Sequence, residues 1–225
     1  YEYDQPGRMT KHYKPANPTT AIVTNVYDSL SRIKQQKDYQ LNAWDYYFAG
    51  SRSEEVNPNG KGSVVYWGNM GTVLKTINQI GKKTISEYDG QRRLTKKTAP
   101  EGNAVQFVYD SKHRVTQTTV KAKPASGLLD VVTSATYDAT WGKVKTTTDN
   151  MGRVTTFNYD LSNGNLLSVV SPSVTGLGSS TVSMTYNARG QVLTVTSPDG
   201  IVGKNTYDTS TEKLTSSVAD FGVGR

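Results

Sequence analysis

The dipeptide Tyr-Asp recurs along this chain at a spacing of about one β-hairpin, and this period constrains the fold more than any other feature. With 14 Tyr in 225 residues, random placement would give about one such pair. The chain holds seven pairs and one Tyr-Asn near copy, at Tyr3-Asp4, Tyr27-Asp28, Tyr88-Asp89, Tyr109-Asp110, Tyr137-Asp138, Tyr159-Asp160, Tyr186-Asn187 and Tyr207-Asp208. Self-similarity at a regular period indicates a repeat architecture.

The repeated unit is longer than the dipeptide. The first copy continues Gln-Pro-Gly-Arg, which places Gly7 and Arg8 at short, fixed offsets from the tyrosine. A second turn sequence, Pro-x-Gly, begins at Pro58, Pro100 and Pro198. One unit therefore contains two segments of strand length, each followed by a turn sequence.

Each position of the unit has a chemical role. Tyr favours a strand, and Asp suits the first position of a type I turn, where its carboxylate accepts a backbone N–H from further round the turn. Gly three residues later suits a position of positive φ, and Pro is pre-set for the second position of a turn. These roles predict an antiparallel meander of hairpins.

Apolar alternation supports the same fold class. Residues 104–109 and 181–186 place Val, Phe or Met, and Tyr at alternate positions, which is typical of strands with one packed face. The best helical candidate, residues 29–40, reads better as another turn, because it follows a Tyr-Asp pair. The predicted fold is all-β, an antiparallel β-hairpin repeat array.

The repeat predicts a single array over residues 1–225, with about ten units. The units near Tyr46 and Tyr66 are degenerate, and loop-like insertions lengthen the spacing near residues 121–130 and 173–180.

Several turns depart from the pattern in ways that predict their geometry. Ser31, Arg92 and His113 occupy the slot where Gly is usual, and His tolerates the left-handed conformation. Gly142 and Gly164 come one residue late, which predicts turns that are one residue longer.

Composition excludes several classes of protein. The chain has no cysteine, so disulfides and thiolate metal sites are excluded. No apolar run approaches the roughly 20 residues of a membrane-spanning helix. Hydrophobic content is 35% and mean hydropathy is −0.57, which fits a sheet with two partly wet faces or a segment of a longer protein.

The net charge of +7 is concentrated in residues 82–145, which carry 12 Lys or Arg against 6 Asp or Glu. A basic surface for an acidic partner is one interpretation. Solvated outward faces of strands are the better one, because the lysines are spread evenly and outward lysines also discourage sheet aggregation. Nucleic acid is not an expected partner.

Both ends of the chain bear on its context. The sequence opens inside a unit at Tyr1 and closes shortly after Tyr207-Asp208, with no capping segment in sight. We therefore expect a segment of a longer protein, whose open sheet edges would self-associate when it stands alone.

Tyr-Asp-x-x-Gly-Arg followed by an apolar residue and Thr, then Pro-x-Gly, resembles the YD repeat of the RHS family. Residues 3–10 are the clearest copy, residues 88–95 match except at the Gly slot, and residues 149–155 are a third, offset copy. The resemblance covers nearly the whole chain. Related repeats occur in insecticidal toxin complexes and in teneurins.

The resemblance implies a structural role rather than an enzyme. Family repeats wind as a β-sheet that spirals into a shell, and in bacterial toxins that shell encloses or displays a toxic domain. The implied setting is a secreted or cell-surface bacterial protein, and the implied partners are neighbouring repeats, an enclosed toxin domain and a glycan. The family's core-ending Asp-Pro-x-Gly-Leu motif is absent, since residues 220–223 lack Pro and Leu.

No catalytic constellation is visible in the sequence. His12 and His113 are the only histidines and lie far apart, which argues against a metal or catalytic pair. Seven of the 13 Asp are explained by the turn rule. We therefore expect no catalytic residue, no metal and no cofactor.

An aromatic cluster near the degenerate units is the best candidate for ligand contact. Its members are Tyr39, Trp44, Tyr46, Tyr47, Tyr66 and Trp67. Exposed rings could stack on sugars, which makes a glycan-binding, adhesin-like module the alternative function. Packing between neighbouring hairpins is the more ordinary role for strand aromatics.

Overall fold

The computed structural model describes residues 1–220 and consists almost entirely of antiparallel strands. The first ten strands are β1 Glu2–Tyr3, β2 Met9–Lys14, β3 Asn17–Tyr27, β4 Ile33–Asp38, β5 Ala43–Ala49, β6 Arg52–Val56, β7 Gly62–Trp67, β8 Val73–Ile77, β9 Lys83–Tyr88 and β10 Leu94–Thr98. The next ten are β11 Ala104–Tyr109, β12 Val115–Lys121, β13 Val131–Tyr137, β14 Val144–Thr148, β15 Val154–Tyr159, β16 Leu166–Val170, β17 Thr181–Tyr186, β18 Val192–Thr196, β19 Val202–Tyr207 and β20 Leu214–Asp220. One short 3-10 helix, η1 Asn69–Gly71, joins β7 to β8.

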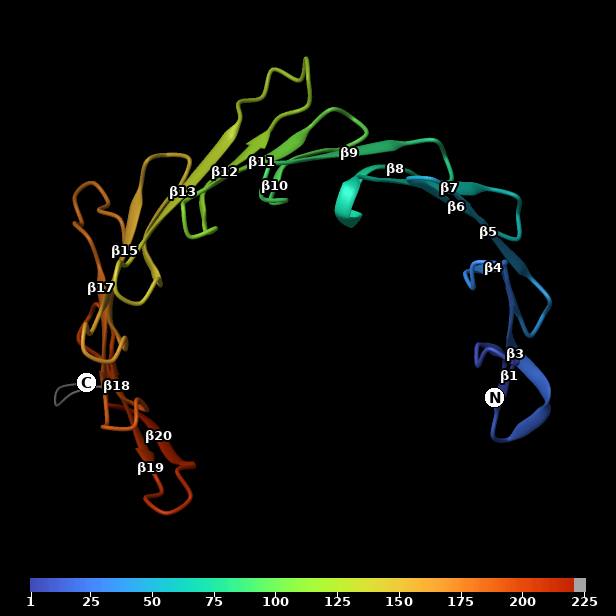
Figure 1. Cartoon of the computed structure of the whole chain (residues 1–225). Coiled ribbons are helices and arrows are strands. Elements are labelled where there is room, and N and C mark those ends of the chain that lie inside the picture. Colours follow the sequence, from blue (N-terminus) through green and yellow to red (C-terminus); the bar gives the residue numbers. More distant parts are fainter. Residues whose placement is uncertain (221–225) are drawn as a thin grey trace. The chain divides into compact units, whose positions relative to one another are not determined.

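The strands belong to one open sheet. From β1 to β11, and again from β12 to β20, each strand pairs antiparallel with its neighbour along the chain. The predicted antiparallel meander is confirmed, and Figure 1 follows its hairpins in chain order. The chain divides into two compact units, residues 1–106 with 121–128 and residues 107–120 with 129 onward. The best helical candidate, residues 29–40, contains the turn that the sequence favoured there, closed by Asp28 and Arg32, followed by strand β4.

The turns use one hydrogen-bonding scheme. In the first, the Asp4 N–H donates to the Arg8 carbonyl at 3.0 Å, and the Gly7 N–H donates to the Asp4 carbonyl at 2.9 Å. Gly7 has φ +83°. This is a type I turn followed by a left-handed residue that makes a bulge, a standard hairpin connection. The Pro-x-Gly turns have the same form, with Pro100 and Gly102 inside the turn closed by Ala99 and Asn103.

The left-handed slot is occupied as predicted even where glycine is missing. Ser31, Arg92 and His113 have φ of 61°, 64° and 65°. The prediction of two longer turns is confirmed. The Gly142 and Gly164 N–H groups donate to the carbonyls four residues earlier, whereas the equivalent bond in the first turn, from Gly7 to Asp4, spans three residues. The backbone conformation or the length of the turn could therefore be predicted from the sequence at each of these positions.

Neither face of the sheet has a core. Within residues 1–220, Ala104 is the only apolar residue that is buried, at 4% exposure. The alternation predicted for residues 181–186 is confirmed, since Val182, Met184 and Tyr186 are half-buried while their neighbours are exposed. The prediction of one packed face is therefore confirmed only in part. The low mean hydropathy fits the interpretation of a sheet with two partly wet faces.

The degenerate units keep an aromatic ring in the tyrosine position, but not the residue assigned from the sequence. Phe48, rather than Tyr46, lies under the guanidinium of Arg32, with the Cζ atom 4.5 Å from the ring centroid. Trp67 ends β7 before a turn closed by Gly68 and Thr72. The register of β4 against β5, with Gln35 opposite Asp45, places Phe48 opposite Arg32. The turn from β5 to β6 is a tight one, in which Ala49 pairs directly with Arg52.

Glycine replacement should separate left-handed turn positions from ordinary ones. Gly152 has φ +77° and Gly90 does not have positive φ, while both have open space around the position of a Cβ. Gly152→Ala should lower the free energy of unfolding by about 1 kcal/mol because an L-residue is strained there. Gly90→Ala should be neutral or stabilising, because it lowers the entropy of the unfolded chain. Chemical denaturation of the two variants measures both, and equal losses would contradict the assignment.

Candidate functional site

The side-chain hydrogen bonds and ion pairs that recur most regularly in the chain lie in its turns. These turns fall into two sets at opposite ends of the strands. The Tyr-Asp turns follow the strands that end in an aromatic ring and comprise residues 4–8, 28–32, 68–72, 89–93, 110–114, 138–143, 160–165, 187–191 and 208–213. The opposite turns comprise residues 38–42, 57–61, 78–82, 99–103, 149–153 and 197–201.

The first residue of a turn organises it through its side chain. Asp89 Oδ1 accepts the backbone N–H groups of Gln91 and Arg93 at 2.9 and 3.0 Å, and Oδ2 accepts Arg93 Nε at 2.6 Å. Asn78 reproduces the two backbone bonds, from Ile80 and Lys82 at 3.1 and 2.9 Å. The amide therefore folds the turn as the carboxylate does, and the carboxylate adds an ion pair to the arginine.

These contacts lower the pKa of the turn carboxylates. The Arg93 backbone N–H lowers the pKa of Asp89 most, and the Arg93 side chain adds to the effect. At Asp4 the Arg8 side chain is the leading cause of a lowered pKa. Low pKa values keep these groups ionised at neutral pH, as turn-forming acceptors rather than as general acids.

The tyrosines join neighbouring hairpins. Six of the repeat tyrosines donate their hydroxyl to the carbonyl of the first residue of the preceding strand, an interaction that the sequence did not predict. The pairs are Tyr27 with Met9 at 2.7 Å, Tyr88 with Val73 at 3.1 Å, Tyr137 with Val115 at 2.6 Å, Tyr159 with Val144 at 2.9 Å, Tyr186 with Leu166 at 2.8 Å and Tyr207 with Val192 at 2.9 Å. The ring thus stabilises the start of the strand beside it.

We call this connection between neighbouring hairpins the joint. The last side chain of a Tyr-Asp turn adds further contacts to it. Arg114 places its Cζ 4.3 Å from the ring centroid of Tyr137, and its Nη1 donates to the Gly142 carbonyl at 3.4 Å. Gly142 is the left-handed residue of the next Tyr-Asp turn. Gln191 repeats the link without a charge, donating from Nε2 to the Glu212 carbonyl at 2.9 Å. Consecutive turns are therefore tied to each other as well as to the strands.

The opposite turns are linked by side chains alone. Asn57 Nδ2 donates to Gln79 Oε1 at 3.0 Å. Glu101 accepts Lys82 at 2.5 Å and Lys123 at 3.2 Å, and these two lysines, Lys82 first, lower its pKa. Lys123 lies in the first predicted insertion, so this loop is held against the turn at residues 99–103.

The predicted ligand-contact aromatics do not converge on one site. Tyr39 lies in an opposite turn with 61% of its surface exposed, and Tyr47 is 54% exposed on β5. Trp44 and Tyr46 occupy alternate positions of the same strand, where burial raises the pKa of Tyr46. The other two rings have intramolecular partners. Lys75 Nζ lies 3.9 Å from the centroid of Tyr66, and Trp67 Nε1 donates to Ser53 Oγ at 2.9 Å.

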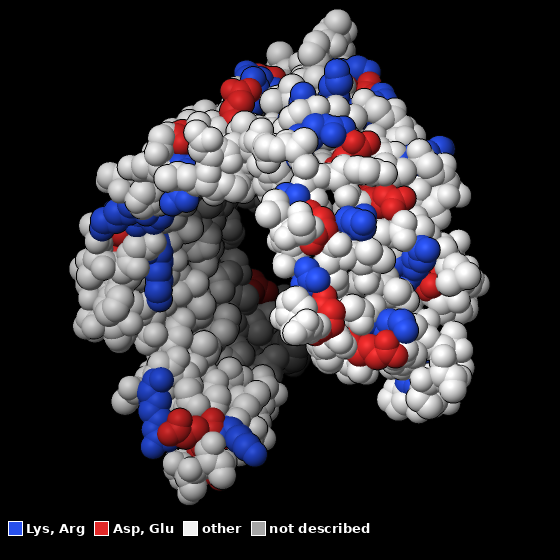
Figure 2. Space-filling view, turned by 45° about the vertical axis from the view of Figure 1, so that its right-hand side comes forward, with Lys and Arg blue, Asp and Glu red and all other residues white. Residues whose placement is uncertain are grey.

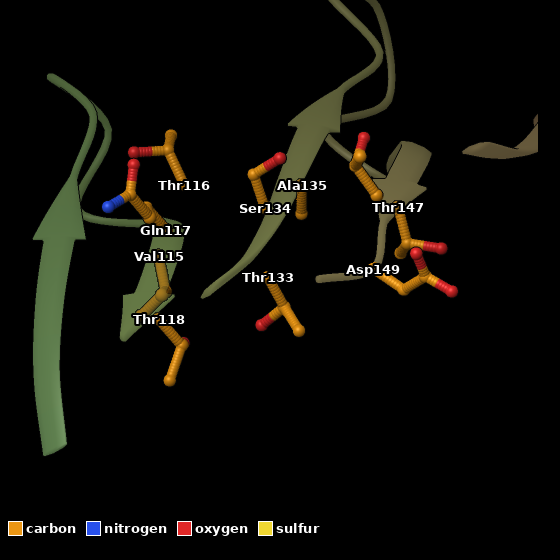
Figure 3. Close-up of a pocket in the computed structure, with 10 residues that line it drawn as sticks. Val115, Thr116, Gln117, Thr118, Thr133, Ser134, Ala135, Thr147 and Asp149 are labelled. Atoms are coloured by element: carbon orange, nitrogen blue, oxygen red, sulfur yellow. The ribbon is translucent and has the colours of Figure 1, made fainter. Parts of the chain in front are cut away.

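A shallow hollow of about 350 Å³ is lined by side chains of β12, β13 and β14 and by Asp149. Figure 3 shows the residues that line it. Asp149 is its one ionisable lining residue and pairs with Arg153 at 2.6 Å. Residues 1–220 also contain no cluster of three His, Asp or Glu that could hold a metal ion. His12 stacks on Tyr1 with centroids 4.4 Å apart.

Charge is distributed in pairs rather than in a patch. On the face drawn in Figure 2, many Lys and Arg side chains lie beside Asp and Glu side chains. The turn pairs account for this, for example Arg32 with Asp28 at 2.7 Å. The observation favours the interpretation of solvated strand and turn surfaces. Within residues 1–220 no helix has the length and apolar character needed to cross a membrane.

Two further aspartates act as turn residues. Asp38 and Asp149 open opposite turns and accept the backbone N–H groups of Asn42 and Arg153, each at 3.0 Å. Asp149 begins the offset copy at residues 149–155, in which Arg153 stands four positions later as it does in the intact Tyr-Asp turns. Sequence reasoning missed Asp38, because no tyrosine precedes it and Asn42 stands where the arginine would be.

One protein family matches part of the chain. Residues 88–123 match the family described as RHS Repeat. No curated protein matches the sequence.

Solved structures of Tc toxin components are similar at low identity. TcdB2-TccC3-TEV is 13% identical over 88% of this chain and 14% of that chain, with a TM-score of 0.48. TcdB2-TccC3 is 13% identical over 97% and 18%, with a TM-score of 0.41. The Photorhabdus luminescens Tc holotoxin pore, in a TccC3 mutant, is 13% identical over 88% and 16%, with a TM-score of 0.36. The chain thus spans less than a fifth of each of these chains.

Substitution of Asp89 should separate its two roles. Asp89→Asn keeps the backbone acceptor that Asn78 exemplifies and loses the ion pair, so the thermal midpoint should fall less than in Asp89→Ala. Because the pKa of Asp89 lies below its ordinary value of 3.8, the ionised carboxylate stabilises the folded chain above about pH 3.8, and this stabilisation is lost as the pH falls further. Melting curves from pH 7 to 2 measure both effects. A variant Asp89→Asn with unchanged acid dependence would contradict the ion-pair assignment.

Removing one tyrosine hydroxyl should weaken one joint. Tyr186→Phe keeps the ring and loses the bond to the Leu166 carbonyl, so the free energy of unfolding should fall by about 0.5–1.5 kcal/mol. Tyr47→Phe, at a ring that is 54% exposed, is the matched control and should change little. Urea denaturation measures both variants. Equal effects at the two positions would show that the hydroxyl joint does not stabilise the array.

Proposed function

We propose that this chain, whose residues 88–123 match the RHS repeat family, is a repeat segment of the RHS type and forms part of the wall of a β-sheet shell that encloses or displays a toxic domain. In this proposal the parent is an exported or cell-surface bacterial protein. The work of the segment is mechanical, and its partners are the neighbouring repeats and the enclosed domain.

The observation that carries the proposal is the joint between hairpins. Six tyrosine hydroxyls bond to the backbone of the preceding strand, and turn side chains bond to the following turn. Every joint links neighbours only, so the same contacts can extend an array to any length. A wall needs this property, whereas a compact binding domain does not.

The thin, single-layer construction supports the same role. The sheet buries almost no apolar residue of its own within residues 1–220. Its stability must therefore come from strand pairing, turns and joints, which act in the plane of the sheet.

Protection of a domain by the wall can be tested in the parent protein. Limited proteolysis of a product that contains this segment and its toxic region should leave that region intact. The double variant Tyr137→Ala/Tyr186→Ala removes two joints and should expose it, while Tyr47→Ala should not. A toxic region digested equally fast in the unaltered protein would contradict enclosure.

A glycan-binding surface is the second candidate, favoured by the exposure of Tyr39 and Tyr47 at 61% and 54%. Such rings could stack on sugar faces. A glycan array probed with the chain should then show binding that Tyr47→Ala or Trp44→Ala reduces at least tenfold, while Tyr186→Phe leaves it unchanged. No binding by the unaltered chain would reject this candidate.

A further inference from the structure

The connection from β12 to β13, residues 122–130, carries two adjacent exposed leucines (Figure 1). Leu128 and Leu129 are 74% and 90% exposed. In the part of the chain that the structure describes, residues 127–129 make no backbone–backbone hydrogen bond, and the Leu128 N–H donates to Ser126 Oγ at 3.3 Å. This stretch therefore lies outside the sheet, with its backbone open to a partner.

The first half of the connection is fixed to the turn beside it. Lys123 Nζ lies 3.2 Å from Glu101 Oε2. A Cβ added to Gly102 would stand 2.9 Å from Pro124 Cδ, so the proline packs closely on that glycine. The Ser126 N–H closes a turn on the Lys123 carbonyl at 3.1 Å. The two leucines follow directly after this anchored part.

Exposure alone does not distinguish these leucines, because other exposed leucines lie in closed turns. Leu41 is 76% exposed, and its N–H donates to the Asp38 carbonyl at 3.0 Å. Leu177 is 85% exposed in the second insertion, and its N–H donates to the Val174 carbonyl at 2.9 Å inside a small hairpin. The backbone at Leu128 and Leu129 differs from these in lacking such bonds.

This difference decides where a protease can act on the folded chain. Strands and closed turns must unfold locally before they enter an active site, so their cleavage tracks the small population of the open form. An exposed loop whose backbone is already unpaired escapes this cost and is a preferred site of nicking. The leucines add the large apolar side chains that an apolar specificity pocket accepts.

We propose that the connection at residues 122–130 is a processing site for an endoprotease with a pocket that accepts leucine. Water adds across the peptide bond on the carboxyl side of Leu128 or Leu129. The leucine carbonyl becomes a carboxylate, and the residue that follows gains a free amino group. No further reactant is needed.

The cut leaves the array assembled. Strands β12 and β13 fall on opposite sides of it and remain paired, with Val120 opposite Val131. The Tyr137 hydroxyl still donates to the Val115 carbonyl at 2.6 Å across the same pair of strands. One chain thus becomes two chains that stay bound, a property that goes beyond the proposed wall and does not depend on an enclosed domain.

Limited digestion of the folded chain with chymotrypsin, whose pocket accepts large apolar and aromatic side chains, tests the site. The first cut between β2 and β20 should follow Leu128 or Leu129, as read from the fragment masses. The two fragments should elute together in native size-exclusion chromatography and separate in denaturant. A first cut at Leu41, at Leu177 or at any tyrosine, or fragments that separate without denaturant, would overturn the proposal.

A change of the leucines tests their contribution. The double variant Leu128→Asp/Leu129→Asp should slow the first cut at least tenfold, because a carboxylate does not fit an apolar pocket. Leu177→Asp is the matched control at an equally exposed position and should leave the rate unchanged. Thermal midpoints equal to that of the unaltered chain show that both variants fold. A double variant that is cut at the same place as fast as the unaltered chain would overturn the role of the leucines.

Discussion

The hydrogen bond from a tyrosine hydroxyl to the backbone of the preceding strand is the interaction on which the rest of this structure depends. A single-layer sheet cannot rely on a hydrophobic core, and within residues 1–220 only Ala104 is a buried apolar residue. The tyrosine supplies a partly buried ring and a satisfied polar end at the same place. Because it reaches the first residue after the preceding turn, it stabilises strand pairing where hairpins would otherwise separate.

The turns transmit this stabilisation along the chain. Arg114 shows how, because one guanidinium contacts its own turn aspartate at 2.7 Å, the next tyrosine ring and the next turn. Each contact is a modest surface interaction in isolation. Related contacts from Arg8, Arg32, Lys143 and Gln191 recur at other Tyr-Asp turns and couple nearest neighbours, so stability should approximate a sum of unit and joint terms. Weakening one joint is then a local event.

Much of the local structure could be predicted from single residues. The Gly slot, its replacement by His113, and the late Gly142 each predicted a turn that the structure contains. These features depend on φ preferences and on bonds within five or six residues, which the sequence displays directly. The role of each ring in the predicted aromatic cluster could not be predicted in this way. A ring on a strand can bond to a neighbouring strand, as Trp67 does through Ser53, or face solvent, as Tyr47 does.

The sequence by itself determined that this chain is a β-hairpin repeat with aspartate-led turns, because turn formation is local chemistry. Only the tertiary structure decided what the repeated tyrosine and arginine do. Their partners, such as the Val115 carbonyl for Tyr137, lie about 20 residues away and are chosen by strand register. Register also set Phe48 rather than Tyr46 under Arg32, because β5 pairs with β4 with Asp45 opposite Gln35.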